Sequence, residues 1–200
     1  MSKTITVVIP TYTLSKELEE MAIRCLISYR EQADEIIVCE DGGLYSPELM
    51  KLADTYIYNN TNGGFTKNVN RGWRFSSGDY TAIVNSDTEL MKGDIHDLCV
   101  PGKVTSPIIH NQYIDLLAGP FFVIPKKVKE ERGMLLEEMH TYSSDSEYEK
   151  RVTDIFQRVD TVTIYHEQAQ TVSAAGVEGG IQQEKDRQAY DKLVREGKAK

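Results

Sequence analysis

Short apolar runs alternate with segments of helical periodicity through the first ninety residues of the chain. The apolar runs are brief, β-rich and bounded by polar residues, so they predict strands over residues 5–9, 35–39, 55–58 and 80–84. Between them, apolar positions at helical spacing predict helices that begin near residues 15, 46 and 66. Alternating strands and helices indicate βαβ units, and therefore an α/β fold with a mostly parallel central sheet flanked by helices.

The second half of the chain has a less regular pattern. Apolar runs predict strands over residues 104–109, 113–117, 121–124 and 161–165, the first two paired through a turn. Amphipathic segments predict helices over residues 126–131 and 145–159, with a polar loop at residues 141–144 between them. We expect a single domain over residues 1–200, with halves 1–90 and 91–180 and a charged helix or tail at 181–200.

Composition narrows the class of protein. With 40% hydrophobic and 27% charged residues, the 200-residue chain is typical of a soluble globular domain. Its formal charge of −8 gives no general attraction to nucleic acid or an anionic membrane. The three cysteines lack metal-ligand spacing and their odd number does not suggest a disulfide framework. We expect a cytoplasmic protein, because no signal peptide or membrane-spanning stretch is evident.

The strand predicted at residues 80–84 runs directly into Asn85, Ser86 and Asp87. In open α/β sheets, ligands bind at the carboxyl ends of the strands. A carboxylate beside an amide and a hydroxyl at that place is a hard oxygen site suited to Mg²⁺ or Mn²⁺. The alternative is a simple turn, because all three residue types favour turns.

Other predicted strands end in residues suited to ligand binding at the same edge of the sheet. The first strand ends at Pro10, Thr11 and Tyr12, and the second ends at Asp41. Asp41 can accept a hydrogen bond from the N3–H of a pyrimidine or from a ribose hydroxyl, although turn chemistry is the alternative. Tyr12 would stack on the base, with Thr11 flanking it.

A polar loop over residues 59–64 follows the third predicted strand. Gly63 and Gly64 would let the backbone approach a phosphate closely, and Lys67 could neutralise its charge. Lys67 and Arg71 could equally form a solvated helix face, as charged helix residues usually do.

Several short motifs occur in a familiar order along the chain. They are Val8-Ile9-Pro10-Thr11-Tyr12, Glu40-Asp41-Gly42-Gly43, Asn62 with Gly64, Asn70 with Gly72, Asn85-Ser86-Asp87, the acidic segment from Asp145 to Arg151, and His166. Over residues 4–167, this order resembles the family 2-like inverting glycosyltransferases, which have the GT-A fold.

The resemblance implies a nucleotide-sugar donor and a Mn²⁺ or Mg²⁺ cofactor. The expected donor-binding residues are Pro10, Thr11, Tyr12, Asp41, Gly63, Gly64, Lys67, Asn70, Asn85 and Ser86. The expected metal ligands are Asp87 and His166, although His166 could equally be a hydrogen-bonded histidine at a strand end. A UDP- or dTDP-linked donor is favoured because Asp41 suits a pyrimidine.

An inverting transfer needs a base that deprotonates the acceptor hydroxyl. By resemblance, Asp145 fits that position best, with Glu147 as a substitute. The family pattern usually has an acidic residue just before this aspartate, whereas this chain has Ser144. The alternative for Asp145 is a helix N-cap.

Together these features predict a metal-dependent inverting glycosyltransferase that moves a sugar to a hydroxyl acceptor, such as a glycan or a soluble small molecule. One alternative acceptor is a hydroxymethylated DNA base of a virus, bound through Lys126, Lys127 and Lys129. Another alternative is a nucleotidyltransferase, but the basic glycine-rich loop that this class needs after the first strand is lacking. A third is a non-catalytic protein that binds sugar nucleotides. Oligomeric state stays open.

Overall fold

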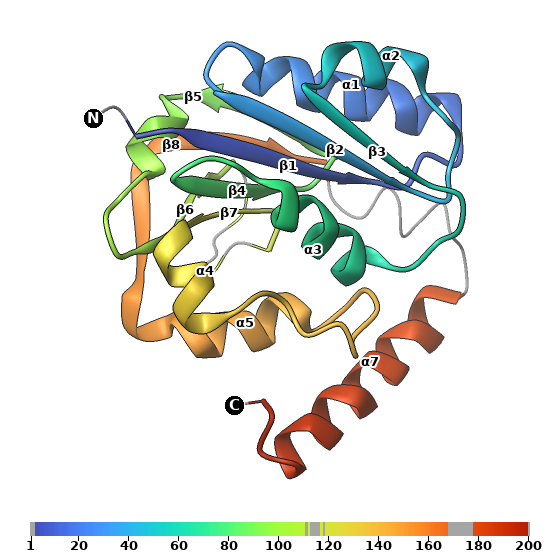
Figure 1. The fold of residues 1–200 in the computed structure, drawn as a ribbon, viewed down its shortest axis with the longest axis vertical. Helices are drawn as coiled ribbons and strands as arrows, with labels where there is room; N and C mark the ends of the chain where they lie inside the picture. Colours follow the sequence, from blue (N-terminus) through green and yellow to red (C-terminus); the bar gives the residue numbers. More distant parts are fainter. Residues whose placement is uncertain (1–2, 111, 113–116, 118, 168–177, 200) are drawn as a thin grey trace.

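A computed structural model shows one continuous eight-stranded sheet with helices on both faces (Figure 1). It describes residues 3–110, 112, 117, 119–167 and 178–199. Helices α1 and α2 cover one face of the sheet, and α3, α4 and α5 lie on the other face (Figure 1). Within the described residues, no helix combines the length and apolar character needed to cross a membrane.

The elements follow the predicted alternation in the first half of the chain. The strands are β1 (Ile5–Thr11), β2 (Glu35–Asp41), β3 (Thr55–Asn59), β4 (Tyr80–Val84), β5 (Thr88–Lys92), β6 (Val104–Ile109), β7 (Phe121–Pro125) and β8 (Phe156–His166). The helices are α1 (Lys16–Arg30), α2 (Pro47–Leu52), α3 (Phe65–Phe75), α4 (Lys126–Arg132), α5 (Ser144–Val152) and α7 (Glu178–Arg195), with 3-10 turns at η1 (Ile95–Leu98) and η2 (Thr153–Ile155).

The sheet is mixed: four of its seven neighbouring strand pairs are parallel and three are antiparallel, so the expected parallel arrangement holds throughout the first half but not in the second. Its strand order is β3-β2-β1-β4-β7-β6-β8-β5. Strands β1 to β4 are all parallel, because a helix returns the chain between each consecutive pair of them. Strand β7 pairs antiparallel with both β4 and β6, and β5 pairs antiparallel with β8. Only the pair β6–β8 is parallel in the second half.

The central strand β1 is buried along its whole length and contributes to two cores. Val7 and Ile9 belong to the core beneath α1, whereas Val8 belongs to the core beneath α3 and α5. This division follows from the alternation of side chains across a strand. Burial on both faces explains why the strand reads as a continuous apolar run rather than an alternating pattern.

Helix α3 packs closely on the sheet at Gly72. A Cβ atom there would lie 2.5 Å from Val8 Cγ1 and 2.8 Å from Cys39 Sγ, so only glycine permits this approach. The close contact fixes the helix over β1 and β2. It thereby places the helix N-terminus beside the ends of these two strands.

Two element predictions in the second half are wrong. The helix predicted to extend to Val159 ends at Val152, and β8 begins at Phe156. Pairing of residues 156–159 with β6 overrides their helical spacing. Strand β5, which directly follows Asp87, was not predicted. The strand predicted at 113–117 falls largely outside the described residues.

Candidate active site

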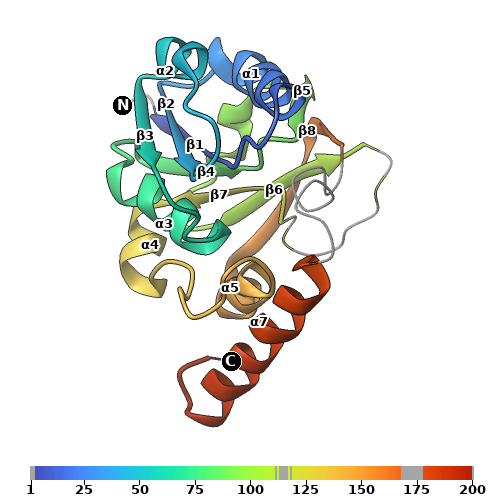
Figure 2. The same cartoon turned by 90° about the vertical axis from the view of Figure 1, so that its right-hand side faces the viewer.

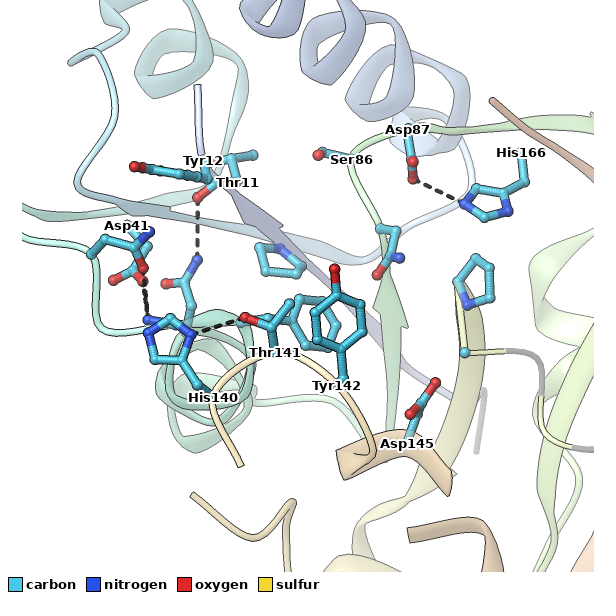
Figure 3. A pocket seen from close by; sticks show the side chains of 18 residues that line it. Thr11, Tyr12, Asp41, Ser86, Asp87, His140, Thr141, Tyr142, Asp145 and His166 are labelled. Carbon is cyan, nitrogen blue, oxygen red and sulfur yellow. Dashed lines mark hydrogen bonds and ion pairs between the residues drawn. The ribbon is translucent and has the colours of Figure 1, made fainter. Parts of the chain in front are cut away.

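A pocket of about 340 Å³ opens where β1, β2 and β4 end (Figure 3). Ten of the residues expected from the sequence line it: Pro10, Thr11, Tyr12, Asp41, Gly64, Asn85, Ser86, Asp87, Asp145 and His166. Asp41 and Asp87 therefore face one cavity although 46 positions of sequence separate them. Figure 3 shows Asp41 and Tyr12 at one end, Asp87 and His166 at the other, and Asp145 on a third side.

The ends of β1 and β2 are tied together by Glu40, a residue that is fully buried. Its carboxylate accepts hydrogen bonds from the hydroxyls of Thr11 and Thr13, each at 2.8 Å, and from the backbone N–H of Gly43 at 2.9 Å. These bonds satisfy a charge that would otherwise be costly to bury. They fix the loop that presents Thr11 and Tyr12 to the pocket.

Asp41 organises the loop before α3. Its Oδ2 accepts hydrogen bonds from the backbone N–H groups of Gly63 and Gly64, both at 2.8 Å. Its Oδ1 accepts from Asn59 Nδ2 at 2.9 Å and lies 3.4 Å from Arg71 Nη1. Both oxygens thus have two donors each, which uses the acceptor capacity of a carboxylate. A pyrimidine N3–H could bind Asp41 only by displacing one of these donors, and Arg71 is the most distant.

Asp87 and His166 meet from the ends of β4 and β8. Asp87 Oδ1 lies 3.4 Å from His166 Nε2, and the N–H of Glu167 donates to the backbone oxygen of Asp87 at 2.9 Å. Asp87 Oδ1 is buried, yet it makes no hydrogen bond with the described residues. Such an orphaned carboxylate oxygen beside an imidazole suits a divalent cation.

These two side chains suit a metal ion that takes its remaining ligands from the substrate and from water. Among residues that the structure describes, no three His, Cys, Asp or Glu side chains group around one point. Asp87 and His166 would therefore supply two ligands, and phosphate oxygens and water the others. Metals that work on nucleotides are usually held in this manner, by one or two carboxylates together with substrate phosphates.

The segment after β4 is both a turn and part of the pocket, so the two sequence readings are compatible. The N–H of Thr88 donates to Asn85 O at 3.2 Å, which closes the turn. Cys25 Sγ donates to the same oxygen at 3.4 Å. Burial raises the pKa of the Cys25 thiol to about 12, so this cysteine stays protonated and supports the turn rather than acting as a nucleophile.

Asp145 lies in the first turn of α5 and reaches the pocket beside Gly119. A Cβ atom on Gly119 would be 2.5 Å from Asp145 Oδ2, so the absence of a side chain there makes room for the carboxylate. Ser143, just before the helix, has a φ of 67°. It is the one non-glycine residue with positive φ in the described part of the chain. Such strain is characteristic of functional sites.

The sequence reading missed one wall of the pocket, the loop His140-Thr141-Tyr142. The ring of His140 lies against Gly64, where a Cβ atom would be 2.5 Å from His140 Cδ2. The N–H of Thr66 donates to the backbone oxygen of His140 at 3.1 Å. The loop therefore closes the pocket over the start of α3. In the sequence, the only indication of this pocket wall was the presence of aromatic and imidazole side chains just before the acidic helix.

Four predicted site residues do not line the pocket: Gly63, Lys67, Asn70 and Glu147. Glu147 is fully buried and pairs with Arg151 at 2.6 Å, so its assignment as a substitute base is corrected. The Asn70 side chain donates to the backbone oxygen of Leu135 at 2.8 Å, and thus supports a loop instead. Lys67 is exposed on α3, as the solvated-face reading expected.

Solved structures with the same architecture are glycosyltransferases. GalNAc-T7 with UDP, GalNAc and Mn²⁺ superposes with a TM-score of 0.69 at 12% identity, covering 82% of this chain and 43% of that chain. The mannosyltransferase PcManGT from Pyrobaculum calidifontis, with GDP-Man and Mn²⁺, has a TM-score of 0.68 at 15% identity, covering 100% and 66%. TarS 1-349 of S. aureus with UDP has a TM-score of 0.62 at 15% identity, covering 81% and 60%.

These likenesses establish a GT-A glycosyltransferase fold, in a chain that spans less than two thirds of the length of each of those three proteins. Residues 6–99, just under half of the chain, match the family model described as glycosyl transferase family 2. This match supports the resemblance expected from the motifs over that part of the chain, and the family that it names is one of glycosyltransferases. No curated protein matched the chain in a sequence comparison.

Proposed function

We propose that this chain is a metal-dependent, inverting glycosyltransferase that moves a sugar from a nucleotide-sugar donor to a hydroxyl acceptor. The observation that supports this proposal most strongly is the convergence of Asp87, His166 and Asp145 on the pocket that also contains Asp41 and Tyr12. These residues come from four strand ends and one helix start, so their meeting is a property of the fold.

Residues at the ends of β1 and β2 would bind the nucleoside of the donor. Tyr12 offers a ring for stacking, and Gly64 lines the same pocket with the His140 ring packed against it. Asp87 and His166 would hold a divalent cation, which would stabilise the negative charge that develops on the diphosphate leaving group.

Asp145 would act as the general base on the opposite side of the pocket. It would take the proton from the acceptor hydroxyl, whose oxygen forms the new bond to the anomeric carbon. The bond from that carbon to the donor phosphate breaks, and its electron pair leaves with the nucleoside diphosphate. Attack opposite the leaving group inverts the anomeric centre.

The nucleobase of the donor is identified by comparing the affinities of the protein for UDP, dTDP and GDP. The pyrimidine preference rests on Asp41, whose two oxygens already have four donors within the protein. A preference for UDP or dTDP would require the base to replace Arg71 at Asp41 or to be read by other groups. Binding of GDP as tightly as UDP would overturn the pyrimidine preference.

The metal assignment is tested by calorimetric titration of UDP and GDP, with and without Mn²⁺. We expect nucleotide binding that depends on Mn²⁺, and we expect Asp87→Ala to weaken it by at least about tenfold because a ligand is lost. Asp160→Ala, an exposed aspartate on β8 outside the pocket, is the matched control and should bind as the unaltered chain does.

Failure of both nucleotides to bind at millimolar concentration would contradict the proposed function. Equal Mn²⁺-dependent binding in Asp87→Ala and Asp160→Ala would remove the metal assignment alone. Slow hydrolysis of a nucleotide sugar without an acceptor would separate an enzyme from a non-catalytic binding protein.

A further inference from the structure

The C-terminal helix α7 projects from the body of the molecule, with its first turns nearest the pocket loop 140–142 (Figures 1 and 2). Most of its surface is polar and exposed, as its sequence suggests. Two of its side chains are nonetheless almost fully buried, Asp186 at 1% exposure and Leu193 at 4%. A buried aspartate on an otherwise solvated helix requires an explanation.

Asp186 accepts hydrogen bonds from three consecutive backbone amides of the pocket loop. Its Oδ1 accepts from His140 N at 2.7 Å, and its Oδ2 accepts from Thr141 N and Tyr142 N, each at 2.8 Å. Gln182, one turn earlier on the helix, donates to Asp186 Oδ1 at 2.8 Å. The carboxylate is therefore saturated, and the backbone of the loop is fixed at three successive residues.

The same helix also contacts α5, the helix that carries Asp145. Lys150 of α5 donates to the hydroxyl of Tyr190, and its ammonium lies 4.8 Å from the centre of that ring. Asp186 and Tyr190 are four residues apart and so lie on one face of α7. That face supports residues 140–150 on both sides of Asp145.

We propose that Asp186 is a positioning residue, through which α7 sets the loop 140–142 in the conformation that closes the donor pocket. The loop contributes three side chains to the wall of the pocket, and its His140 ring lies against Gly64. Asp186 lines no part of the pocket itself, so it acts through the loop. The inference rests on the proposed function for its ligand, a nucleoside diphosphate with Mn²⁺.

The pKa of Asp186 is consistent with this role. Burial raises the pKa of this carboxyl, but hydrogen bonds from Tyr142, His140, Thr141 and Gln182 together hold it below its ordinary value. The ionised form is thus the one that the loop binds.

Hydrogen exchange of the loop amides tests the positioning directly. Asp186→Asn keeps the shape of the side chain, but its NH₂ group faces backbone N–H donors that need an acceptor. We expect the amides of residues 140–142 to exchange at least about tenfold faster through local opening, while the amides of β1 and β4 stay far better protected and change only with global stability. The control is Asp191→Asn, an exposed aspartate on the same helix, which should exchange as the unaltered chain does.

Nucleotide affinity tests whether the loop position matters to the pocket. If the closed loop is populated in about a tenth of Asp186→Asn molecules, the Kd for UDP or GDP with Mn²⁺ rises about tenfold. The measurement is made well below the unfolding temperature, so that a merely stabilising role of α7 would leave the Kd unchanged. Gln182→Ala is a milder variant and should shift exchange and Kd in the same direction, with Gln183→Ala as its control.

The outcomes separate this inference from the proposed function. Exchange at residues 140–142 that is equal in Asp186→Asn and Asp191→Asn overturns the positioning role, whether or not any nucleotide binds. A Kd that stays within twofold of the unaltered chain, despite faster exchange, overturns the coupling to the pocket. Failure of the unaltered chain to bind UDP and GDP overturns the proposed function, while the exchange comparison still decides whether Asp186 positions the loop.

Discussion

The two sides of the pocket are built in different ways. The nucleotide side is formed by the ends of three adjacent parallel strands, β2, β1 and β4, and by the residues that follow them. The opposite side is formed by the contiguous loop 140–142 and start of α5, together with the end of β8 further along the chain. Buried carboxylates fix loops on both sides, but the first side rests on adjacent strand ends, whereas the second also depends on a contact with the C-terminal helix.

Because of this difference, substitutions of carboxylates on the two sides should have different effects. On the nucleotide side, the buried carboxylates of Glu40 and Asp41 already accept hydrogen bonds from within the protein. These bonds fix the backbone that the ligand would contact. On the opposite side, Asp145 is only partly buried, and its one hydrogen bond to a described residue is from the N–H of Ser146. A carboxylate with that freedom is the better candidate for proton transfer.

The sharpest contrast is between two carboxylates on one helix, Asp145 and Glu147. Asp145→Asn should lower kcat by about 10²–10⁴ with little change in Tm, because a base is lost and no buried contact is broken. Glu147→Gln should instead cost about 3 kcal/mol of folding free energy, because it leaves the charge of Arg151 without its buried partner. That loss corresponds to a decrease in Tm of roughly 6 °C or more.

The two variants are compared by steady-state kinetics with a nucleotide sugar and by thermal unfolding of the same samples. Glu147→Gln should retain the kcat of the unaltered chain at a temperature where it is fully folded. If kcat falls as much in Glu147→Gln as in Asp145→Asn, Glu147 is again a candidate for the general base.

The sequence predicted the strand ends of the nucleotide side because local physics determines them, although Gly63, Lys67 and Asn70, expected on the same side, do not line the pocket. Residues 5–9 and 80–84 are continuous apolar runs, and parallel strands place their ends at one edge, so Thr11, Asp41 and Asp87 could be gathered without coordinates. The helical spacing from Ser15 was equally informative, and the Ser15 hydroxyl does accept from Leu18 N as an N-cap.

The opposite side could not be predicted to the same depth, because long-range contacts determine it. Nothing local indicates that Asp186 meets the backbone of residues 140–142, more than forty positions away. Glu147 and Asp145 have the same charge and are two residues apart, so spacing alone could not show which one faces the pocket. Pairing of β8 with β6 likewise ended a helix that the spacing predicted to continue.

Gly119→Ala is a smaller change on the same side of the pocket. The added Cβ atom would lie 2.5 Å from Asp145 Oδ2, so it would displace the carboxylate, and a misplaced catalytic group lowers the rate steeply. We expect a decrease in kcat of about tenfold, with a change in Tm below that of Glu147→Gln, because the end of a flexible side chain can move aside. Gly180→Ala, where no atom lies within 4 Å of the added carbon, is the matched control. Unchanged kcat in Gly119→Ala would show that the position of Asp145 is not critical.

A last prediction concerns a pH-dependent contribution of Asp186 to stability. Because the hydrogen bonds from the loop hold the folded-state pKa of Asp186 below its ordinary value of 3.8, its ionised form stabilises the fold above that value. The contribution is lost as the pH falls through the folded-state pKa, where the carboxyl becomes protonated in both states.

At pH 7 we expect Asp186→Asn to unfold about 4–8 °C below the unaltered chain, equivalent to about 2 kcal/mol for charged hydrogen bonds. As the pH falls below 3.8 and through the lower folded-state pKa, the gap between the two melting temperatures should close, whereas Asp191→Asn should follow the unaltered chain throughout. A gap that stays constant down to pH 3 would show that the charge of Asp186 does not stabilise the docked helix, and the opposite side of the pocket would then owe its position to packing alone.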